Sequence, residues 1–300
     1  MIEDEWERKD IVQHRLRVRR QFHWLTGVLD VEETALSLVK PFDVRTLDPE
    51  LVACSGEHML RVWGYWRVAL SAEGQNWRAS SGRFSPFLLL DRTSGALLGI
   101  LNLADPPENW PAMDRYMGWG SGIRDKAAKK WRFVHRTLYL GRCLPLYDFG
   151  PYAGGKLMTL AATSREVVAL QDWRYSLEFL FFTVRTLHGR GSQYNRLHAR
   201  GLRYLGSDEK GRGFYMMELR QDAIAYVKVG AALGPVIAPA FTDQVAWWKA
   251  RWLPGRIIHV GTPIVTPDPD RYRVSRRFRD KHFALHRKQA DYLVGAKGPA

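Results

Sequence analysis

The chain has 300 residues, of which 46% are hydrophobic and 12% aromatic, and this composition excludes wholesale disorder and allows one substantial core. Its 45 Lys and Arg residues exceed its 31 Asp and Glu residues, which gives a formal net charge of +14 at pH 7. That charge favours a polyanionic partner, most commonly nucleic acid, and a basic enzyme without such a partner is the alternative. Cys54 and Cys143 are too few and too far apart for a disulfide framework or a Cys-x-x-Cys metal site, which fits a reducing cytoplasm.

No membrane segment is expected. Residues 1–5 lack the basic and apolar regions of a signal peptide, and the apolar run at 177–184 is too short to span a bilayer. Residues 223–241 are apolar overall, but Lys228, glycines and prolines interrupt them. We therefore predict a cytoplasmic protein without a membrane partner.

Basic residues gather near the N-terminus. Residues 6–24 mix arginines and a lysine with apolar side chains, a pattern compatible with a basic amphipathic helix. Such a helix can lie along a phosphate backbone, and a solvated helix face is the alternative. We assign residues 1–50 to a basic, helical N-terminal segment.

The middle of the chain predicts an α/β (α+β) fold with a mixed central sheet flanked by helices. Residues 87–91 and 97–103 have the composition of strands, and Ser94-Gly95 between them predicts a hairpin turn. Residues 131–138 are compatible with a helix, and a further strand is expected near 138–146.

The first of two glycine-centred segments follows that strand. It contains Tyr147 and, after a short spacer, Gly154, Gly155 and Lys156, where a helix over 156–170 is expected to begin. Backbone N–H groups at a helix start, together with its dipole, can bind a phosphate. We predict that these four residues bind the phosphate of a cofactor. A glycine turn needed only for a tight connection is the alternative.

A buried strand over 177–186 leads to the second glycine-centred segment, a short helix over 193–200 and another strand. Arg190 stands between two glycines, so its guanidinium can approach a phosphate or carboxylate closely. Tyr194 can donate a proton to a leaving group. The alternatives are an exposed turn arginine and a half-buried packing tyrosine. We assign Arg196 to nucleic-acid binding.

The C-terminal end is basic again. Residues 271–288 interleave arginines and lysines with aromatic side chains, which suits both phosphate neutralisation and stacking on bases. A solvated tail is the alternative. The predicted nucleic-acid contacts here are Arg273, Arg276, Arg277, Arg279 and Lys281.

The order strand, glycine loop, helix, strand, short helix, strand resembles the acyl-coenzyme A transferases of the GCN5-related (GNAT) superfamily. In that superfamily a loop after the fourth strand holds the pyrophosphate, and a later tyrosine, followed by Gly-Leu or Gly-Phe, lies near the sulfur. Tyr194 with Gly201-Leu202 resembles the second element, whereas the loop at 149–156 departs from the usual Gly-x-Gly or Gly-x-Ala pattern. The resemblance implies a GNAT-like core domain over 51–230, an acyl-coenzyme A or other phosphorylated donor, and a separate C-terminal extension at 231–300.

Six motifs follow one another at 95–103, 114–119, 140–147, 154–157, 164–167 and 189–197. Together they resemble the family named after the A component of the Druantia anti-phage system, over about residues 60–220. The resemblance implies bacterial and phage proteins tied to defence and mobile DNA, with a transferase-like fold. It implies no particular reaction.

Asp114 is the remaining candidate for catalysis. It either fixes a loop through an ion pair with Arg115 or acts as a general base. No metal is expected, because His135, His188 and His198 have no partner at metal-ligand spacing. The sequence also lacks a Gly-x-Ser-x-Gly elbow, a Walker loop and a paired-carboxylate nuclease motif, which argues against hydrolases, ATPases and two-metal nucleases.

Two hypotheses about function follow. The first is a transferase that moves an acyl or aminoacyl-type group onto a DNA base, with Tyr194 and Asp114 as its catalytic residues. The second is a non-catalytic DNA-binding component of a phage-defence or mobile-element complex. Both predict a nucleic-acid partner, DNA in preference to RNA.

Overall fold

The computed structural model describes residues 29–71, 82–106, 134–186, 189–191, 193–226 and 238–275. They fall into two compact units, which we call the terminal unit and the sheet unit. The terminal unit takes the described parts of Met1–Val39, Ser55–Ala79 and Pro267–Ala300, and the sheet unit takes those of Lys40–Cys54 and Ser80–Thr266.

The helices and strands have the following bounds. The described α-helices are α2 (Glu32–Leu36), α3 (Glu57–Ser71), α6 (Gly154–Ala162), α7 (Arg165–Tyr175) and α8 (Phe241–Val260). The strands are β1 (Phe42–Asp43), β2 (Pro49–Ala53), β3 (Phe84–Asp91), β4 (Leu97–Ala104), β5 (Thr137–Pro145), β6 (Phe181–Arg185), β7 (Arg203–Ser207), β8 (Gly213–Glu218) and β9 (Ile264–Val265). Short 3-10 helices occupy Gly150–Tyr152, His198–Arg200, Gln221–Tyr226 and Pro269–Tyr272.

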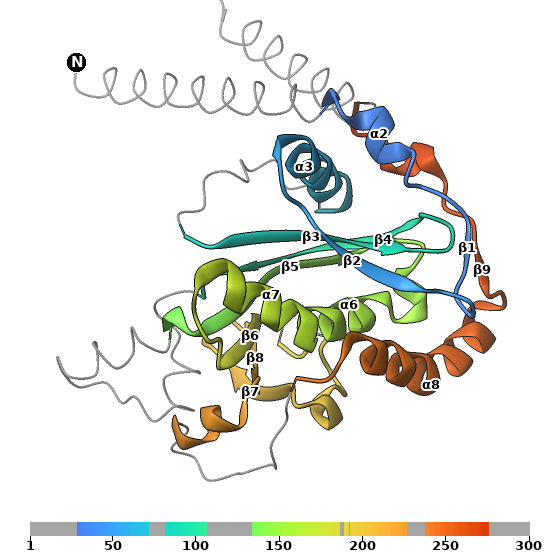
Figure 1. Cartoon of the computed structure of the whole chain (residues 1–300). Helices are drawn as coiled ribbons and strands as arrows, with labels where there is room; N and C mark the ends of the chain where they lie inside the picture. Colours follow the sequence, from blue (N-terminus) through green and yellow to red (C-terminus); the bar gives the residue numbers. More distant parts are fainter. Residues whose placement is uncertain are drawn as a thin grey trace, which may run out of the picture. The chain divides into compact units, whose positions relative to one another are not determined.

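A mixed seven-stranded sheet forms the centre of the sheet unit, in the order β2-β3-β4-β5-β6-β8-β7 (Figure 1). Neighbouring strands are antiparallel except β5 and β6, which run parallel. Helices α6 and α7 lie between these two strands in the chain, as a parallel pair requires a crossover connection. The predicted mixed sheet with flanking helices is confirmed.

The parallel pair is short. Thr137 pairs with Phe181 and Tyr139 pairs with Thr183, but β5 is nine residues long and continues to Pro145. The later part of β5 therefore has no partner in β6, and its backbone groups must bond to other parts of the chain.

Strands β3 and β4 form the hairpin that the sequence predicts. The buried Asp91 carboxylate accepts hydrogen bonds from the Ser94 N–H at 3.0 Å and the Ser94 hydroxyl at 2.6 Å. It also accepts one from the Asp48 N–H at 2.8 Å, immediately before β2. Gly95 has a φ of 69°, a conformation that glycine adopts without strain. One carboxylate thus holds the ends of three neighbouring strands in register.

The strands around the first glycine-centred segment also follow the sequence. The strands expected near 138–146 and within 177–186 are β5 and β6. Because β5 already begins at Thr137, the helix predicted over 131–138 is restricted, among the described residues, to 134–135.

Two other predicted helices differ from the structure. The helix predicted over 156–170 is divided into α6 and α7, because Ser164 between them has an extended backbone with φ −70° and ψ 152°. The residues predicted as a short helix at 193–200 form turns followed by a 3-10 helix. The cause is the left-handed backbone of Arg196, with a φ of 64°, which an α-helix cannot contain.

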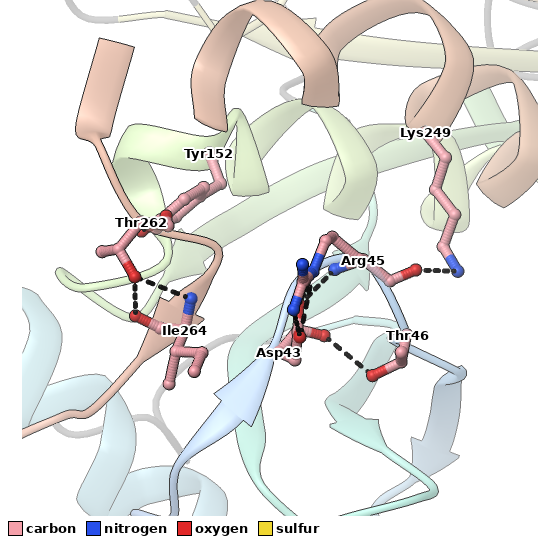
Figure 2. A network of polar contacts seen from close by, with 7 residues as sticks. All are labelled: Asp43, Arg45, Thr46, Tyr152, Lys249, Thr262 and Ile264. Atoms are coloured by element: carbon pink, nitrogen blue, oxygen red, sulfur yellow. Dashed lines mark hydrogen bonds and ion pairs between the residues drawn. The ribbon is translucent and has the colours of Figure 1, made fainter. Parts of the chain in front are cut away.

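Helix α8 lies beside α6 (Figure 1), and it is held by contacts of a residue in its middle and of a residue just beyond its end. The Trp248 indole N–H donates to the Ala153 carbonyl oxygen at 3.0 Å, next to the first residue of α6. Just after α8, the Thr262 carbonyl oxygen accepts a hydrogen bond from the Tyr152 hydroxyl at 2.8 Å (Figure 2). These contacts fix α8 against the glycine loop.

The segment that carries β1 is fastened to α8 as well. Figure 2 shows the Lys249 ammonium donating to the Arg45 carbonyl oxygen, at 3.4 Å, and it also donates to the Leu47 carbonyl oxygen at 2.7 Å. The Arg45 guanidinium pairs with the Asp43 carboxylate at 2.5 Å. Strand β1 itself pairs with β9, so the first and last strands of the sheet unit lie side by side.

The terminal unit is held by a buried carboxylate. Glu32 of α2 accepts hydrogen bonds from the Tyr65 hydroxyl of α3 at 3.1 Å and from the Ser275 N–H at 2.9 Å. The Tyr65 hydroxyl also lies 2.9 Å from the Tyr272 carbonyl oxygen. Residues near 272–275 are thereby joined to α2 and α3.

Helix α8 has 20 residues, a length that would suffice to cross a bilayer. It carries Lys249, Arg251 and Arg256, and Pro254 lies inside it. No helix in the described ranges combines the length and the apolar character that a membrane crossing requires.

Replacing Gly154 tests how tightly α6 packs at its start. A Cβ atom there would lie 2.4 Å from the Cδ1 atom of the Phe149 ring. That ring is fully buried, with the rings of Phe42 and Trp248 at centroid distances of 5.7 and 5.9 Å. We expect Gly154→Ala to lower the free energy of unfolding by about 1–3 kcal/mol, measured by urea denaturation.

The matched control is Gly255→Ala in α8, where a Cβ atom would meet nothing within 4 Å. Alanine has the higher helix propensity, so this variant should be neutral or more stable by up to about 1 kcal/mol. Equal losses of stability in the two variants would contradict the packing argument.

Candidate functional site

The two glycine-centred segments lie against each other. The Lys156 ammonium donates to the Asn195 carbonyl oxygen at 2.6 Å, and the Gln193 side-chain amide donates to the Cys143 carbonyl oxygen at 3.2 Å. A Cβ atom at Gly155 would lie 2.8 Å from the Gln193 side chain, so a larger residue here would displace that side chain from its present position. Gln193 thus bonds to β5 beyond the positions that pair with β6.

Lys156 is held inside the protein and is only 6% exposed. Its Nζ atom lies 4.7 Å from the centroid of the Trp252 ring, in addition to its bond to Asn195. Burial, followed by the charges of Arg196 and Arg256, lowers the pKa of Lys156 to about 8. A cation in the first turn of a helix is unfavourable, and these two contacts offset that cost.

Tyr194 packs in the same region. Its ring lies 5.5 Å from that of Tyr215, measured between centroids. Burial raises the pKa of Tyr194 well above its usual value, and Cys143 and Tyr139 add to the shift. The phenol therefore stays neutral at physiological pH, and its available chemistry is hydrogen-bond donation.

The Cys143 thiol lies in β5 beside α6. Its Sγ atom is 3.8 Å from the Thr159 hydroxyl oxygen and 3.9 Å from the Gly155 carbonyl oxygen. Burial raises the pKa of this thiol to about 12. Cys143 therefore packs as a small apolar side chain and is not a reactive nucleophile.

Arg190 is exposed and joins this region through a series of contacts. Its guanidinium carbon lies 4.7 Å from the centroid of the Tyr204 ring, and that ring is 5.1 Å from the Tyr215 ring. The Tyr215 hydroxyl donates to the Asn195 side-chain oxygen at 2.7 Å. The backbone carbonyl oxygen of Asn195 also accepts a hydrogen bond from Lys156. A continuous series of contacts therefore links Arg190 to α6.

Helix α8 extends these contacts with further arginine–aromatic pairs. The Arg251 guanidinium lies 5.3 Å from the centroid of the Trp252 ring, on which Lys156 is also placed. The Arg200 guanidinium lies 4.9 Å from the centroid of the Trp247 ring. Arg256, one turn beyond Trp252, is close enough to Lys156 to act on its charge.

These cations have one property in common: within the described part of the chain, none of the arginines among them forms an ion pair with a carboxylate. We call the set the basic cluster, and it consists of Lys156, Arg190, Arg196, Arg200, Arg251 and Arg256. Of the other arginines of the sheet unit, seven pair with carboxylates, namely Arg45, Arg83, Arg92, Arg136, Arg203, Arg212 and Arg220. Arg165, Arg174 and Arg185 form no such pair with the described residues and lie outside the cluster. The arginines of the basic cluster therefore concentrate positive charge without a carboxylate in contact with any of them, although the charge of Asp243 acts on Arg200.

The residues predicted from the sequence fall into four groups. Lys156, Arg190, Tyr194 and Arg196 come together with Gly154 and Gly155, the first residues of α6. Tyr147 is 37% exposed in the loop after β5. Arg273 belongs to the terminal unit and pairs with Glu33 at 2.7 Å. The others lie outside the described residues, namely Asp114, Arg276, Arg277, Arg279 and Lys281.

Sequence reasoning missed the contribution of α8. Arg251, Arg256 and Trp252 lie in a stretch where basic and aromatic residues alternate, Trp247-Trp248-Lys249 followed by Arg251-Trp252. The same pattern drew attention to residues 271–288. A search for this pattern along the whole chain would also have identified α8 as a candidate site.

A separate cavity of about 490 Å³ lies at the other end of the sheet, near the starts of β3 and β5. It is lined by Gly82, Arg83, Phe84, Asp105, His135, Tyr175 and Leu177. The Arg83 guanidinium is already bonded to Asp105 and to the Thr137 carbonyl oxygen. In the described ranges, no group of His, Cys, Asp and Glu side chains is placed to hold a metal ion.

Comparison with known families identifies the chain. The family model described as Druantia protein DruA matches residues 66–231, more than half of the chain. This chain belongs to the DruA family. The match includes the sheet from β3 to β8, both glycine-centred segments and Arg190, Arg196 and Arg200, whereas α8 lies outside it. The resemblance found in the sequence is confirmed.

A curated relative is the Druantia protein DruA of Escherichia coli (strain UMEA 4076-1), which is 30% identical over 139 residues. These residues are 42% of this chain and 33% of the relative, so the chain spans about a third of the relative's length. No solved structure matches this DruA-family chain.

Titration of Lys156 tests its surroundings. Its pKa falls from 10.5 to about 8 in the folded chain, so the unfolded chain binds more protons between these values. Relative to Lys156→Met, the free energy of unfolding of the wild type should rise by on the order of 1–3 kcal/mol from below pH 8 to above pH 10.5. Chemical denaturation across this pH range measures the difference.

Cysteines and tyrosines titrate in both proteins, so the comparison cancels their contributions. The destabilisation of charged Lys156 is fully present below its folded pKa and disappears as the pH approaches its unfolded value. If the difference in the free energy of unfolding between the wild type and Lys156→Met stays constant with pH, the Lys156 ammonium is well solvated.

Proposed function

We propose that this DruA-family protein binds nucleic acid, DNA in preference to RNA, through the basic cluster. The observation that carries this proposal is the set of arginines without ion pairs in a region where aromatic rings accompany them. Phosphate oxygens would take the place of carboxylate partners, and bases would stack on the rings. The formal charge of +14 supports the same conclusion for the whole chain.

Membership of the DruA family supports a setting for this binding. The family is named after a component of the Druantia anti-phage system, and the DNA of an infecting phage in the cytoplasm is a polyanion of the required kind. The predicted basic segments at 6–24 and 271–288 would add phosphate contacts to those of the basic cluster. The protein would then act as a DNA-binding component of a defence complex.

The salt dependence of DNA affinity tests the proposal. In the double variant Arg190→Gln/Arg251→Gln, two of the proposed phosphate contacts are removed at exposed positions. The slope of log affinity against log salt should become shallower by about 0.9 for each contact on duplex DNA and about 0.7 on single strands. Fluorescence anisotropy with labelled DNA over a range of salt concentrations measures both slopes.

The control is Arg45→Gln/Arg92→Gln, which removes the same charge from exposed arginines that already pair with Asp43 and Asp48. This variant should keep most of the wild-type slope, because those guanidiniums are compensated. If the two double variants give the same slope, or if the wild type shows no salt dependence, the basic cluster is not the DNA site.

A second candidate function is group transfer within a GNAT-like fold. The glycine loop follows β5, which is the fourth strand of the seven-stranded sheet in chain order, and it leads directly into α6. This is the position at which the acyltransferase resemblance expects a donor's pyrophosphate. Tyr194, the counterpart of the tyrosine near the sulfur, lies beside the later part of β5.

In this reaction an acyl or aminoacyl-type group would pass from the thioester of an acyl-coenzyme A to an amine or hydroxyl of a DNA base. The carbon–sulfur bond breaks, an amide or ester bond forms, and the proton of the acceptor ends on the departing thiol. Tyr194 would donate a hydrogen bond to the sulfur as charge develops on it. Asp114, the predicted base, lies outside the described residues.

Thermal unfolding with acyl-coenzyme A thioesters tests this second function. A donor present at about 100 times its Kd would stabilise the protein by about 2.7 kcal/mol, and Lys156→Ala should lose this ligand-dependent shift. Comparison of nucleosides by mass spectrometry, from cells with and without the gene, would reveal the modified base. Stabilisation by DNA but by no thioester, together with unchanged nucleosides, would leave binding alone as the function.

A further inference from the structure

Two exposed arginines of the basic cluster each rest on an aromatic ring. The guanidinium carbon of Arg190 is 4.7 Å from the centroid of the Tyr204 ring, and that of Arg251 is 5.3 Å from the centroid of the Trp252 ring. Neither guanidinium donates a hydrogen bond to another described residue. A guanidinium supported by a ring on one side keeps its other side and its N–H groups available for a ligand.

Arg83 shows the same contact in a structural role. Its guanidinium carbon also lies 4.7 Å from an aromatic centroid, that of Phe179. The Arg83 side chain is only 10% exposed, however, and its guanidinium bonds to Asp105 and to the Thr137 carbonyl oxygen at 3.0 Å. These bonds serve the fold of the chain, whereas the N–H groups of Arg190 remain available to a ligand.

The two exposed pairs belong to one connected group of side chains. The Tyr204 ring lies 5.1 Å from the Tyr215 ring, and the Tyr215 hydroxyl donates to the Asn195 side chain at 2.7 Å. Lys156 donates to the Asn195 carbonyl oxygen at 2.6 Å and lies 4.7 Å from the centroid of the Trp252 ring. These contacts connect one arginine–ring pair to the other, so both lie in one region of the sheet unit.

A third arginine–ring pair joins the turn to α8 directly. The guanidinium carbon of Arg200 lies 4.9 Å from the centroid of the Trp247 ring. Trp247 and Arg251 are four residues apart in α8, a spacing that places them on the same face of the helix. The same region therefore offers several planar groups next to positive charge.

Charge and stacking favour different forms of DNA. A duplex has a higher density of phosphates than a single strand, so a purely electrostatic site would bind the duplex more tightly. The faces of paired bases are covered by their neighbours in the duplex, whereas unpaired bases can stack on aromatic rings and guanidinium planes. Planar groups that are open to a ligand therefore favour unpaired bases.

We propose that the Arg190–Tyr204 and Arg251–Trp252 pairs bind unpaired bases and give this protein a preference for single-stranded over duplex DNA. Each guanidinium stacks on a base through its open side, and the N–H groups at its edge donate to a phosphate. This inference rests on the proposed DNA binding and names the form of DNA that the basic cluster binds.

Abasic DNA separates stacking from charge, because it carries the same phosphates without bases. Fluorescence anisotropy at constant salt compares a labelled oligothymidylate, an abasic strand of the same length, and the oligothymidylate paired with its complement. The wild type should bind the oligothymidylate more tightly than the duplex and at least about tenfold more tightly than the abasic strand, since stacking of a single base contributes a factor of this size.

The double variant Arg190→Lys/Arg251→Lys keeps both positive charges and removes both planar groups. Its preference for the oligothymidylate over the abasic strand should fall to about threefold or less. The matched control is Arg45→Lys/Arg92→Lys, at exposed arginines that already pair with carboxylates. This control should keep the wild-type preference.

Variants of Tyr204 test the ring itself. Tyr204→Leu removes the support of Arg190, so the preference for the oligothymidylate over the abasic strand should decrease about two- to threefold. Tyr204→Phe loses only the hydroxyl, which bonds to Ser207, and should restore the preference. A cooperative thermal unfolding transition identifies the variants that are folded.

The outcomes separate this inference from the proposed function. If the wild type binds the oligothymidylate and the abasic strand equally, or binds the duplex most tightly, the stacking inference is wrong and DNA binding stands. An undiminished preference in Arg190→Lys/Arg251→Lys would also overturn the inference. If no form of DNA binds, the proposed DNA binding is itself wrong, and this inference with it.

Discussion

The hydrogen bond from the Lys156 ammonium to the Asn195 carbonyl oxygen is the contact on which the rest of the site depends. It connects the crossover helix α6 to the turn that follows β6, across the region where β5 and β6 no longer pair. Gly155 leaves room for this approach, because a Cβ atom there would lie 2.8 Å from the Gln193 side chain and would displace it. A buried charge is expensive, so the protein surrounds this one with a carbonyl oxygen and an indole ring.

That arrangement explains why basic side chains gather around the turn and α8. Helix α8 is attached to the glycine loop by Trp248 and contributes the ring on which Lys156 is placed. The Arg200 guanidinium, which follows the turn, packs on Trp247 of α8, so the turn and this helix are in direct contact. Burial also changes the chemistry of the region: Cys143 and Tyr194 keep their protons, which leaves cations and hydrogen-bond donors as the groups that can act on a ligand.

Several parts of the fold could be predicted from the sequence, because local residue types determine them. The hairpin of β3 and β4 and the start of α6 depend on local turn chemistry, which Ser94-Gly95 and Gly154-Gly155 carry in their residue types. The order of the elements resembles that of the acyltransferases, and this resemblance implies that both glycine-centred segments contribute to one ligand site. No local sequence signal predicts the division of the helix at Ser164 or the left-handed backbone of Arg196, because tertiary contacts impose these conformations. The part played by α8 depends on long-range packing, and its basic and aromatic residues alone do not reveal where the helix lies.

The pairing of β1 with β9 has a consequence for how this module relates to larger proteins. Phe42 stands opposite Val265, so the chain first enters and finally leaves the sheet unit at neighbouring points, although it also leaves this unit after Cys54 and returns at Ser80. Because the two ends of such a module lie close together, it can be inserted into chains of different lengths without separating the sequences that flank it. The E. coli relative is longer than the region that it shares with this chain, which makes up 33% of that relative.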